Sequence, residues 1–468
     1  MPKSLLLAAA ALFPIVTSAA HAADPAPPPA AGPGSEKTAI DAVIDRNWAD
    51  LDALYIDLHS HPELGFQENR TSALLAARMR KLGFAVTEHV GRTGVVAVLK
   101  NGEGPVVLVR TEIDGLPIEE KTGLAYASRA QQTGADGTQT FVAHACGHDN
   151  HMAWWIGTAE ALLAMKDRWH GTLVFIAQPA EEMVSGAKAM LADGLFTRFP
   201  KPDYGFAAHV DPSLAGTVHV KQGPTTSAVD TINIRFIGVG AHGSMPDRSI
   251  DPIVEGAHFV TDVQSVIARE KDPWKFGVVT VGAFHAGAVS NIISDHADLQ
   301  LTLRSYDPDV RKVINEGVER TARAEAEMAR APAPEIRHTF TASPVINDPA
   351  LAADTAARLA AGLGADKVLL VPVAAPGWTA SEDYSGFVTA GMTHSVYMSI
   401  GGDTQATIDR YKAEGKPLPV NHSPLFAPDH TIAIRTGIEA LTLAVLGVTG
   451  GVKVPRGSHA RSSRTGGG

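Results

Sequence analysis

Cysteine is nearly absent from this 468-residue chain, which contains only Cys146. A single thiol excludes an intramolecular disulfide, so disulfides cannot hold the fold together. Excess positive charge is also absent, because 40 Lys and Arg residues stand against 50 Asp and Glu for a net charge of -10. This balance argues against a nucleic-acid partner, which requires a basic stripe. The composition, 45% hydrophobic and 19% charged, is that of an ordinary globular protein with two or more domains.

The apolar run at the N-terminus is too short for a membrane anchor, which needs about 20 apolar residues. The run spans residues 5–16 and is followed by the small-x-small cleavage site Ala20-His21-Ala22. We therefore expect residues 1–22 to be a cleaved signal peptide. This predicts a secreted protein, located in the periplasm if the host is Gram-negative, with no membrane association after cleavage.

Apolar runs alternate with helical patterns in the first half of the chain. Residues 105–109, 172–177 and 205–208 are continuous apolar runs, typical of strands buried on both faces, and helical patterns intervene at 153–165 and 187–193. This order predicts the α/β class, with a mostly parallel sheet flanked by helices.

From about residue 225 the pattern changes to that of a ferredoxin-like α+β module. The predicted elements are strands at 231–237, 278–284, 296–304 and 335–341 and helices at 251–269 and 309–331. After residue 350 helices and apolar strands resume, at 368–372 and 395–400, so the module is inserted in the larger domain. We predict a signal peptide (1–22), a disordered linker (23–36), a catalytic domain in two parts (37–224 and 342–450), an inserted lid or dimerisation domain (225–341) and a tail left by an expression vector (451–468).

The only cysteine lies in the octet His144-Ala145-Cys146-Gly147-His148-Asp149-Asn150-His151. Sulfur, nitrogen and oxygen ligands at this density are typical of a zinc site. Three apolar strands also end in ionisable residues, namely Asp114, the pair Glu181-Glu182, and His209. Because ligands bind beyond the carboxyl ends of strands in open α/β sheets, these residues are expected to converge on one site.

Five motifs in this order give the chain a family resemblance between about residues 40 and 448. It resembles the amidohydrolase branch of the aminoacylase/glutamate carboxypeptidase family of zinc metallopeptidases, which includes hippurate hydrolases and plant auxin-conjugate hydrolases. The motifs are Arg110-x-Glu112-x-Asp114-x-Leu116-Pro117, His144-Ala145-Cys146-Gly147-His148-Asp149-x-His151, Pro179-Ala180-Glu181-Glu182, His209-Val210 and Asn421-His422-Ser423-Pro424.

The resemblance implies two divalent metal ions, with Zn²⁺ expected and Mn²⁺ or Co²⁺ as alternatives. The ligands it implies are Cys146, His148, Glu182, His209 and His422. Five side chains exceed what one tetrahedral ion accepts, which favours two ions over a single structural ion, while the bridging ligand stays open.

The metal-site motifs also suggest a general base and residues that orient the ligands. Glu181 is the expected base, because side chains alternate in an extended segment and only one of the two glutamates can then face a metal. Asp114 and Asp149 are expected to orient ligating imidazoles. Glu112 stands where the branch has Asp, so it is assigned no role. His144 and His151 are interpreted as packed helix-entry residues.

The predicted insert carries the expected substrate-binding residues. By resemblance, His242 stabilises the oxyanion, in cis or from a partner subunit, although Asp247 replaces a histidine of many relatives. Asn291 and Arg304 match positions that contact a substrate carboxylate. Ser381-Glu382-Asp383-Tyr384 matches a signature that we interpret as structural. Trp154, Trp155 and Trp378 suggest an aromatic or apolar acyl group, although tryptophans of this kind more often belong to the core.

We therefore expect an amide hydrolase that cleaves small N-acyl amino acids or dipeptide-like substrates through a metal-bound hydroxide, acting as a homodimer. Two alternatives remain. One is a deacylase of amides whose amine part is not an amino acid, and the other is an inactive binding protein on the same fold. For the first alternative, Arg304→Ala should leave activity on the best substrate almost intact. The presence of Glu181 argues against the second.

Overall fold

The structure is a computed structural model that describes residues 32–392 and 394–450. The predicted signal peptide, most of the predicted linker and the predicted C-terminal tail lie outside these residues. The linker prediction was wrong at its end, because residues 33–36 form the first turn of helix α1 (Pro33–Ser60). Pro33 stands at the start of that helix, where its fixed φ suits the first turn and its missing N–H is not needed.

An eight-stranded sheet forms the larger part of the fold, in the order β1-β2-β6-β3-β7-β18-β8-β17. Its central strands β6, β3, β7 and β18 are all parallel to one another. The predicted α/β class is therefore confirmed. The strands are β1 (Ala85–Val90), β2 (Gly94–Asn101), β3 (Val106–Glu112), β6 (Gly171–Gln178), β7 (Tyr204–Leu214), β8 (Val218–Lys221), β17 (Val368–Val371) and β18 (His394–Asp403).

Helices cover both faces of this sheet because its apolar strands alternate between two hydrophobic clusters. In β3, Val107 and Val109 join one cluster and Leu108 joins the other. Each such buried side chain contributes about 1.5–3 kcal/mol. The first cluster includes α1, α2 (Asn69–Lys81), α3 (His148–Ala164), α8 (Pro349–Leu363) and α11 (His430–Thr449), and the second includes α4 (Gly186–Ala192), α5 (Leu195–Arg198) and α9 (Ser385–Thr389).

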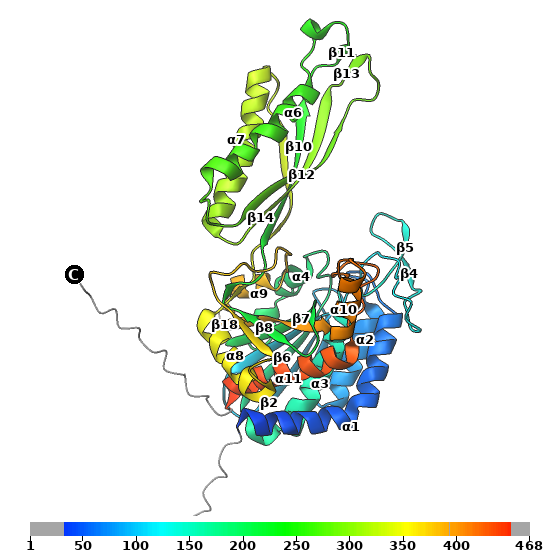
Figure 1. Cartoon of the computed structure of the whole chain (residues 1–468), viewed down its shortest axis with the longest axis vertical. Helices are drawn as coiled ribbons and strands as arrows, with labels where there is room; N and C mark the ends of the chain where they lie inside the picture. Colours follow the sequence, from blue (N-terminus) through cyan, green and yellow to red (C-terminus); the bar gives the residue numbers. More distant parts are fainter. Residues whose placement is uncertain (1–31, 393, 451–468) are drawn as a thin grey trace, which may run out of the picture. The chain divides into compact units, whose positions relative to one another are not determined.

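Helix α11 is long and apolar enough to cross a membrane, with a mean hydropathy of 1.5, but 67% of it is buried inside the protein. It packs against α1, α3 and α8, and Figure 1 shows α1, α3 and α11 together. A Cβ added at Gly437 would lie 2.3 Å from the ring of Trp154 on α3, so this glycine permits the close approach of the two helices. These contacts identify α11 as a core helix.

A second, four-stranded antiparallel sheet has the order β12-β14-β10-β15. Along the chain, its elements are β10 (Ala228–Ile237), α6 (Pro252–Asp262), β12 (Gly277–Ala286), β14 (His296–Ser305), α7 (Pro308–Ala329) and β15 (Glu335–Ala342). This is the β-α-β-β-α-β order expected of the insert, and α6 and α7 lie side by side on one face of the sheet (Figure 1). Whether the insert acts as a lid or a dimerisation surface, and the domain boundaries, stay predictions.

Short elements complete the described fold. They are β4 (Gln131–Thr133), β5 (Gln139–Phe141), β9 (Gly223–Pro224), β11 (Ala241–His242), β13 (Ile292–Ile293), β16 (Ile346–Asn347), α10 (Gln405–Ala413), two 3-10 turns (Lys166–Arg168 and Pro246–Arg248) and a π-helical turn (Val266–Glu270). The helix predicted over 251–269 is thus two elements, because α6 ends at Asp262 and the π-helical turn is separate.

Candidate metal centre

The carboxyl ends of the parallel strands β3 and β6 bring the predicted acidic residues together beside β7. Asp114 follows β3, and Glu181 and Glu182 follow β6. His209 does not follow its strand as predicted, because β7 continues five residues beyond it to Leu214. Its side chain nevertheless reaches the same place, within 3.4 Å of the Cys146 sulfur.

The five predicted metal ligands form one group. Nε2 of His209 lies 3.4 Å from Sγ of Cys146. Nε2 of His148 lies 3.8 Å from Oε1 of Glu182, and the ligand atoms of Cys146, His148 and Glu182 all lie within 4.8 Å of one another. Nε2 of His422 completes the group at 3.2 Å from Oε2 of Glu182.

Both buried histidines of this group have one ring nitrogen committed to the backbone. Nδ1 of His148 donates to the carbonyl of Asp114 at 2.8 Å, and Nδ1 of His209 donates to the carbonyl of Val210 at 2.8 Å. In both rings the Nδ1 proton is held by the backbone, so Nε2 is the nitrogen that can bind a metal. Burial, followed by the neighbouring His151, lowers the pKa of His209 to about 3, so its imidazole is neutral.

Two buried atoms of the group have no hydrogen-bond partner among the described residues, Nε2 of His148 and Oε1 of Glu182. Burial alone would lower the pKa of His148, but the hydrogen bond to Asp114 and the charges of Glu112 and Glu182 raise it to about 10. The surroundings therefore stabilise positive charge at this nitrogen. Buried ligand atoms without a partner, a thiol and surroundings that stabilise positive charge together fit divalent metal ions.

Cys146 and His422 are held in place by the loops that carry them. Asn421 donates to the carbonyls of Cys146 (3.0 Å) and Val210 (3.1 Å), which ties the two ligand loops together. His422 has the left-handed φ of 70°, and its N–H donates to Ala145 at 2.8 Å. Burial raises the pKa of the Cys146 thiol, and the negative charges of Glu182 and Glu181 raise it further. A bound cation is therefore needed to favour the thiolate.

The Glu181-Glu182 segment is a turn, so the expectation of an extended segment with alternating side chains was wrong. Ala180 has a φ of 47°, and its N–H donates to Glu68 at 2.8 Å. In this turn both carboxylates face His148, with Oε2 of Glu181 also 3.8 Å from its Nε2. Burial raises the pKa of Glu181 well above its usual value, and the charge of Glu382 adds to this, so Glu181 is a stronger base than an exposed carboxylate.

Asp114 lies where it can orient two predicted ligands. Its Oδ2 accepts from the backbone N–H of Glu182 at 3.0 Å, and its Oδ1 lies 3.4 Å from Nδ1 of His148. Asp149 is different, because its Oδ2 contacts Nδ1 of His59 at 2.6 Å. The expectation that Asp149 orients a ligating imidazole was therefore wrong.

His151 is buried, and both of its ring nitrogens are occupied. Nε2 accepts from the N–H of Val210 at 3.0 Å, so Nδ1 carries the proton and donates to Oε2 of Glu112 at 3.0 Å. The His151 ring also lies 4.5 Å from the ring of His209 and stacks on Trp154. His151 therefore supports the His209 strand and has no nitrogen left to bind a metal. The packed role that was predicted for His151 agrees with these contacts, and Glu112, to which we assigned nothing, is its partner.

A fully buried arginine connects the strands behind Glu181. Arg110 binds Glu112, contacts Glu382 at 2.7 Å and Asp383 at 3.4 Å, and donates to Gln178 at 2.9 Å. Sequence reasoning missed Tyr397, whose hydroxyl donates to Glu382 at 2.7 Å. No local signal marks this tyrosine, because it reaches the site only through the pairing of β18 with β7.

A cavity of about 930 Å³ lies against the metal centre. Arg304 lines it, contacts Ser381 and makes no ion pair with any described residue. Trp378 lines the cavity as well, whereas Trp154 and Trp155 are fully buried in the core and contribute nothing to it. The lining includes Cys146, Glu181, Glu182, His209 and His422, together with Thr226, Val229, Phe340 and Tyr397.

Two predicted substrate-binding residues lie elsewhere. His242, on β11, and Asn291, next to β13, are neighbours, with the N–H of Gly243 donating to the carbonyl of Asn291 at 2.8 Å. Both residues are exposed, and neither lines the cavity at the metal centre. Within this chain, the structure does not bring them to the predicted ligands.

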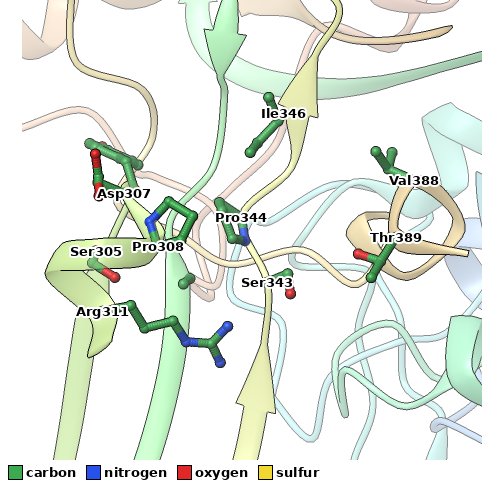
Figure 2. A pocket seen from close by; sticks show the side chains of 11 residues that line it. Ser305, Asp307, Pro308, Arg311, Ser343, Pro344, Ile346, Val388 and Thr389 are labelled. Atoms are coloured by element: carbon green, nitrogen blue, oxygen red, sulfur yellow. The ribbon is translucent and has the colours of Figure 1, made fainter. Parts of the chain in front are cut away.

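A smaller cavity of about 240 Å³ adjoins the start of β10 and the end of β14 (Figure 2). Figure 2 shows Pro308, Pro344 and Val388 among its lining side chains. Its one guanidinium, that of Arg311, is bound to Asp230 at 2.8 Å. We assign no ligand to it, because its charged groups are already paired.

Comparison with known proteins identifies the family. The model of peptidase family M20/M25/M40 matches residues 108–451 of this chain. The chain belongs to this family. The family resemblance predicted from the five motifs is thereby confirmed, and the chain is a hydrolase.

Similar proteins agree with this assignment. Hippurate hydrolase of Campylobacter jejuni is 38% identical over 267 residues, 56% of this chain and 66% of that protein. N-acyl-L-amino acid amidohydrolase of Geobacillus stearothermophilus is 33% identical over 66% of this chain and 81% of its own length.

Two solved structures share the fold over 88% of this chain and all of theirs. A putative aminohydrolase from methicillin-resistant Staphylococcus aureus is 26% identical with a TM-score of 0.76. The Bacillus subtilis YXEP protein, described as a dinuclear metal-binding peptidase of the M20 family, is 27% identical with a TM-score of 0.68.

Proposed function

We propose that this M20-family hydrolase cleaves the amide bond of small N-acyl amino acids or dipeptide-like substrates, using two metal ions and Glu181 as general base. The observation that carries the proposal is the group formed by Cys146, His148, Glu182, His209 and His422 with Glu181 beside it, all but His148 lining one cavity. Hippurate hydrolase and N-acyl-L-amino acid amidohydrolase, among the similar proteins, are named for substrates of this class.

The five ligands would hold two divalent ions, for which Zn²⁺ is our first choice because thiolate, imidazole and carboxylate ligands occur together. When bound, such ions polarise a carbonyl oxygen and lower the pKa of a water molecule. Mn²⁺ and Co²⁺ accept the same nitrogen and oxygen ligands and are the alternatives.

Glu181 moves the proton. Its carboxylate, buried beside Glu382, accepts a proton from the attacking water and delivers it to the leaving amide nitrogen. Burial of the carboxylate raises its pKa and so favours proton uptake. Arg110 holds Glu382 and Gln178 in place through hydrogen bonds, and so fixes the side chains next to Glu181 at this end of the cavity.

Arg304 orients the substrate. Burial lowers its pKa, and because it pairs with no described carboxylate its guanidinium is available for the free carboxylate of an acyl amino acid. Trp378 and Phe340 provide apolar surface for the acyl group in the same cavity.

A panel of N-acyl amino acids and their amino-acid amides, incubated with metal-loaded protein and followed by mass spectrometry, tests this proposal. We expect hydrolysis that a chelator abolishes, a preference for the free carboxylate, and loss of that preference in Arg304→Ala but less so in Arg304→Lys. No turnover with Zn²⁺, Mn²⁺ or Co²⁺ would refute the enzymatic function. An unchanged preference in Arg304→Ala would instead favour a deacylase of other amides.

We further propose a homodimer formed through the insert. Strand β12 is an edge strand, and apolar side chains nearby are exposed, including Val254 (52%), Val289 (55%) and Ile292 (59%). Exposed apolar surface beside an unpaired strand edge supports self-association. In such a dimer His242 would act in the partner's site, and sedimentation of Val254→Asp as a monomer would test it.

Finally, we propose that the protein is secreted, to the periplasm in a Gram-negative host. The support is the N-terminal sequence alone, in which an apolar run precedes Ala20-His21-Ala22. N-terminal sequencing of protein from the producing cells should show a mature chain that begins after residue 22.

A further inference from the structure

A second group of potential metal ligands lies on the insert, away from the residues discussed so far. On α6, Glu255, His258 and Asp262 are spaced by three and four residues, which places them on one face of the helix. Helix α7 packs against α6 and contributes Glu325. The group therefore combines one imidazole and three carboxylates at a contact between two helices.

The distances suit a shared cation. One ligand atom from each of His258, Asp262 and Glu325 lies within 4.8 Å of the other two. Nδ1 of His258 lies 4.0 Å from Oε2 of Glu325, which is too far for a hydrogen bond. A metal ion between these atoms would be bound by one nitrogen and two oxygens.

An independent observation is the burial of unpartnered carboxylate oxygens at this contact. Glu325 is 6% exposed and Glu255 is 3% exposed. Oε2 of Glu325 and both oxygens of Glu255 have no hydrogen-bond partner among the described residues. Buried carboxylate oxygens without a partner are unfavourable, so such atoms indicate a missing ion or proton.

The charge balance of the group points the same way. Among the described residues, no lysine or arginine forms an ion pair with Glu255, Asp262 or Glu325, and the half-exposed His258 is the only cationic group in contact. Burial raises the pKa of Glu255 to about 7, and the charges of Asp251 and Glu325 add to the rise. A divalent cation would neutralise the two nearest carboxylates and let all three stay ionised.

We propose that His258, Asp262 and Glu325 form a third metal site, which binds a divalent transition ion such as Zn²⁺ and links α6 to α7. One imidazole nitrogen with carboxylate oxygens suits Zn²⁺ or Mn²⁺ better than Ca²⁺ or Mg²⁺, which prefer oxygen ligands alone. The ion would stabilise the helical face of the insert. It takes no part in hydrolysis, since none of these residues lines the cavity at the metal centre.

Elemental analysis of the full-length protein, stripped with a chelator, reloaded with Zn²⁺ and dialysed, tests the site. The wild type should retain one zinc more per chain than the His258→Gln/Asp262→Asn double variant. Added Zn²⁺ should also raise the Tm of the wild type more than that of the variant. Activity of the variant should stay within about twofold. The exposed trio His296, Asp295 and Asp298 is the matched control, because Asp298 is already paired with Arg235, so His296→Gln should lose no zinc.

A second variant, Glu325→Gln, removes the buried charge without changing the size of the side chain. It should lose the same single equivalent of zinc, and circular dichroism should show that it is folded. Equal zinc content in the wild type and both variants would overturn the proposal. It would mean that Glu325 and a neighbouring carboxylate share a proton in place of a metal ion.

Discussion

Replacing Asp114 with alanine should weaken metal binding without removing a single ligand. Oδ2 of Asp114 accepts from the N–H of Glu182 at 3.0 Å, and Oδ1 lies 3.4 Å from Nδ1 of His148. The carbonyl of Asp114, which also accepts from His148, survives the substitution. The variant therefore loses the side-chain contacts that orient two ligands and keeps the backbone contact.

The size of the effect follows from the bond that is lost. A hydrogen bond to a charged group contributes about 1.5–3 kcal/mol. At 1.36 kcal/mol for each factor of ten, that is about 10- to 100-fold in affinity, which agrees with the effect of losing a contact that orients a metal ligand. Asp114→Asn keeps an oxygen for the Glu182 N–H, so it should lose less, about tenfold or below.

Competition with a chromophoric chelator would measure the affinity for each ion, and kcat would be measured at saturating metal. We expect Asp114→Ala to bind the weaker ion 10- to 100-fold less tightly and to recover most of its kcat in excess Zn²⁺. If the affinity is unchanged, or if Asn is as damaging as Ala, Asp114 does not orient these ligands in the way described.

Three further predictions concern other residues. Glu181→Gln should lower kcat by about 10²–10⁴ while both ions stay bound, as elemental analysis would show, and loss of metal would point to a ligand role instead. His151→Phe leaves the Val210 N–H without a partner, so metal affinity should fall about 10-fold or more, whereas an unchanged Kd would mean that packing alone holds His209. The hydrogen bonds to Asp149 and Glu120 outweigh burial and raise the pKa of His59 to about 10. Because this lies above the unfolded value near 6.5, the stabilisation is complete below pH 6.5 and is lost as pH rises towards 10. Denaturant titrations should show the wild type losing about 3–5 kcal/mol more than His59→Gln between pH 6.5 and 10, and equal losses would contradict this.

The elements of the fold could be predicted where the local pattern alone determines them. The runs 105–109 and 172–177 became β3 and β6 because continuous apolar segments suit strands buried on both faces. The extension of β7 beyond His209 could not be predicted, because residues 210–214 form no continuous apolar run and their strand conformation depends on pairing with β18. Helix α1 was not predicted, and residues 33–36 were assigned to the linker because a Pro- and Ala-rich composition conceals a proline at the first helical position.

The metal ligands of the site could be predicted, because each of them belongs to a sequence motif. Cys146 and His148 are only two residues apart, at the start of α3, so their proximity follows from the sequence. Tyr397 and the contact between Asp149 and His59 depend on tertiary structure, since their partners lie far away in the chain. The turn at Ala180, with its positive φ, was also invisible, because a residue other than glycine gives no signal for that conformation.

X-ray diffraction from metal-loaded crystals, with anomalous data collected at the zinc edge, would test the central claim most directly. We predict two anomalous peaks enclosed by Cys146, His148, Glu182, His209 and His422, with the Glu181 carboxylate alongside. A single peak there, or zinc bound only elsewhere in the molecule, would contradict the two-metal centre and the hydrolytic mechanism built on it.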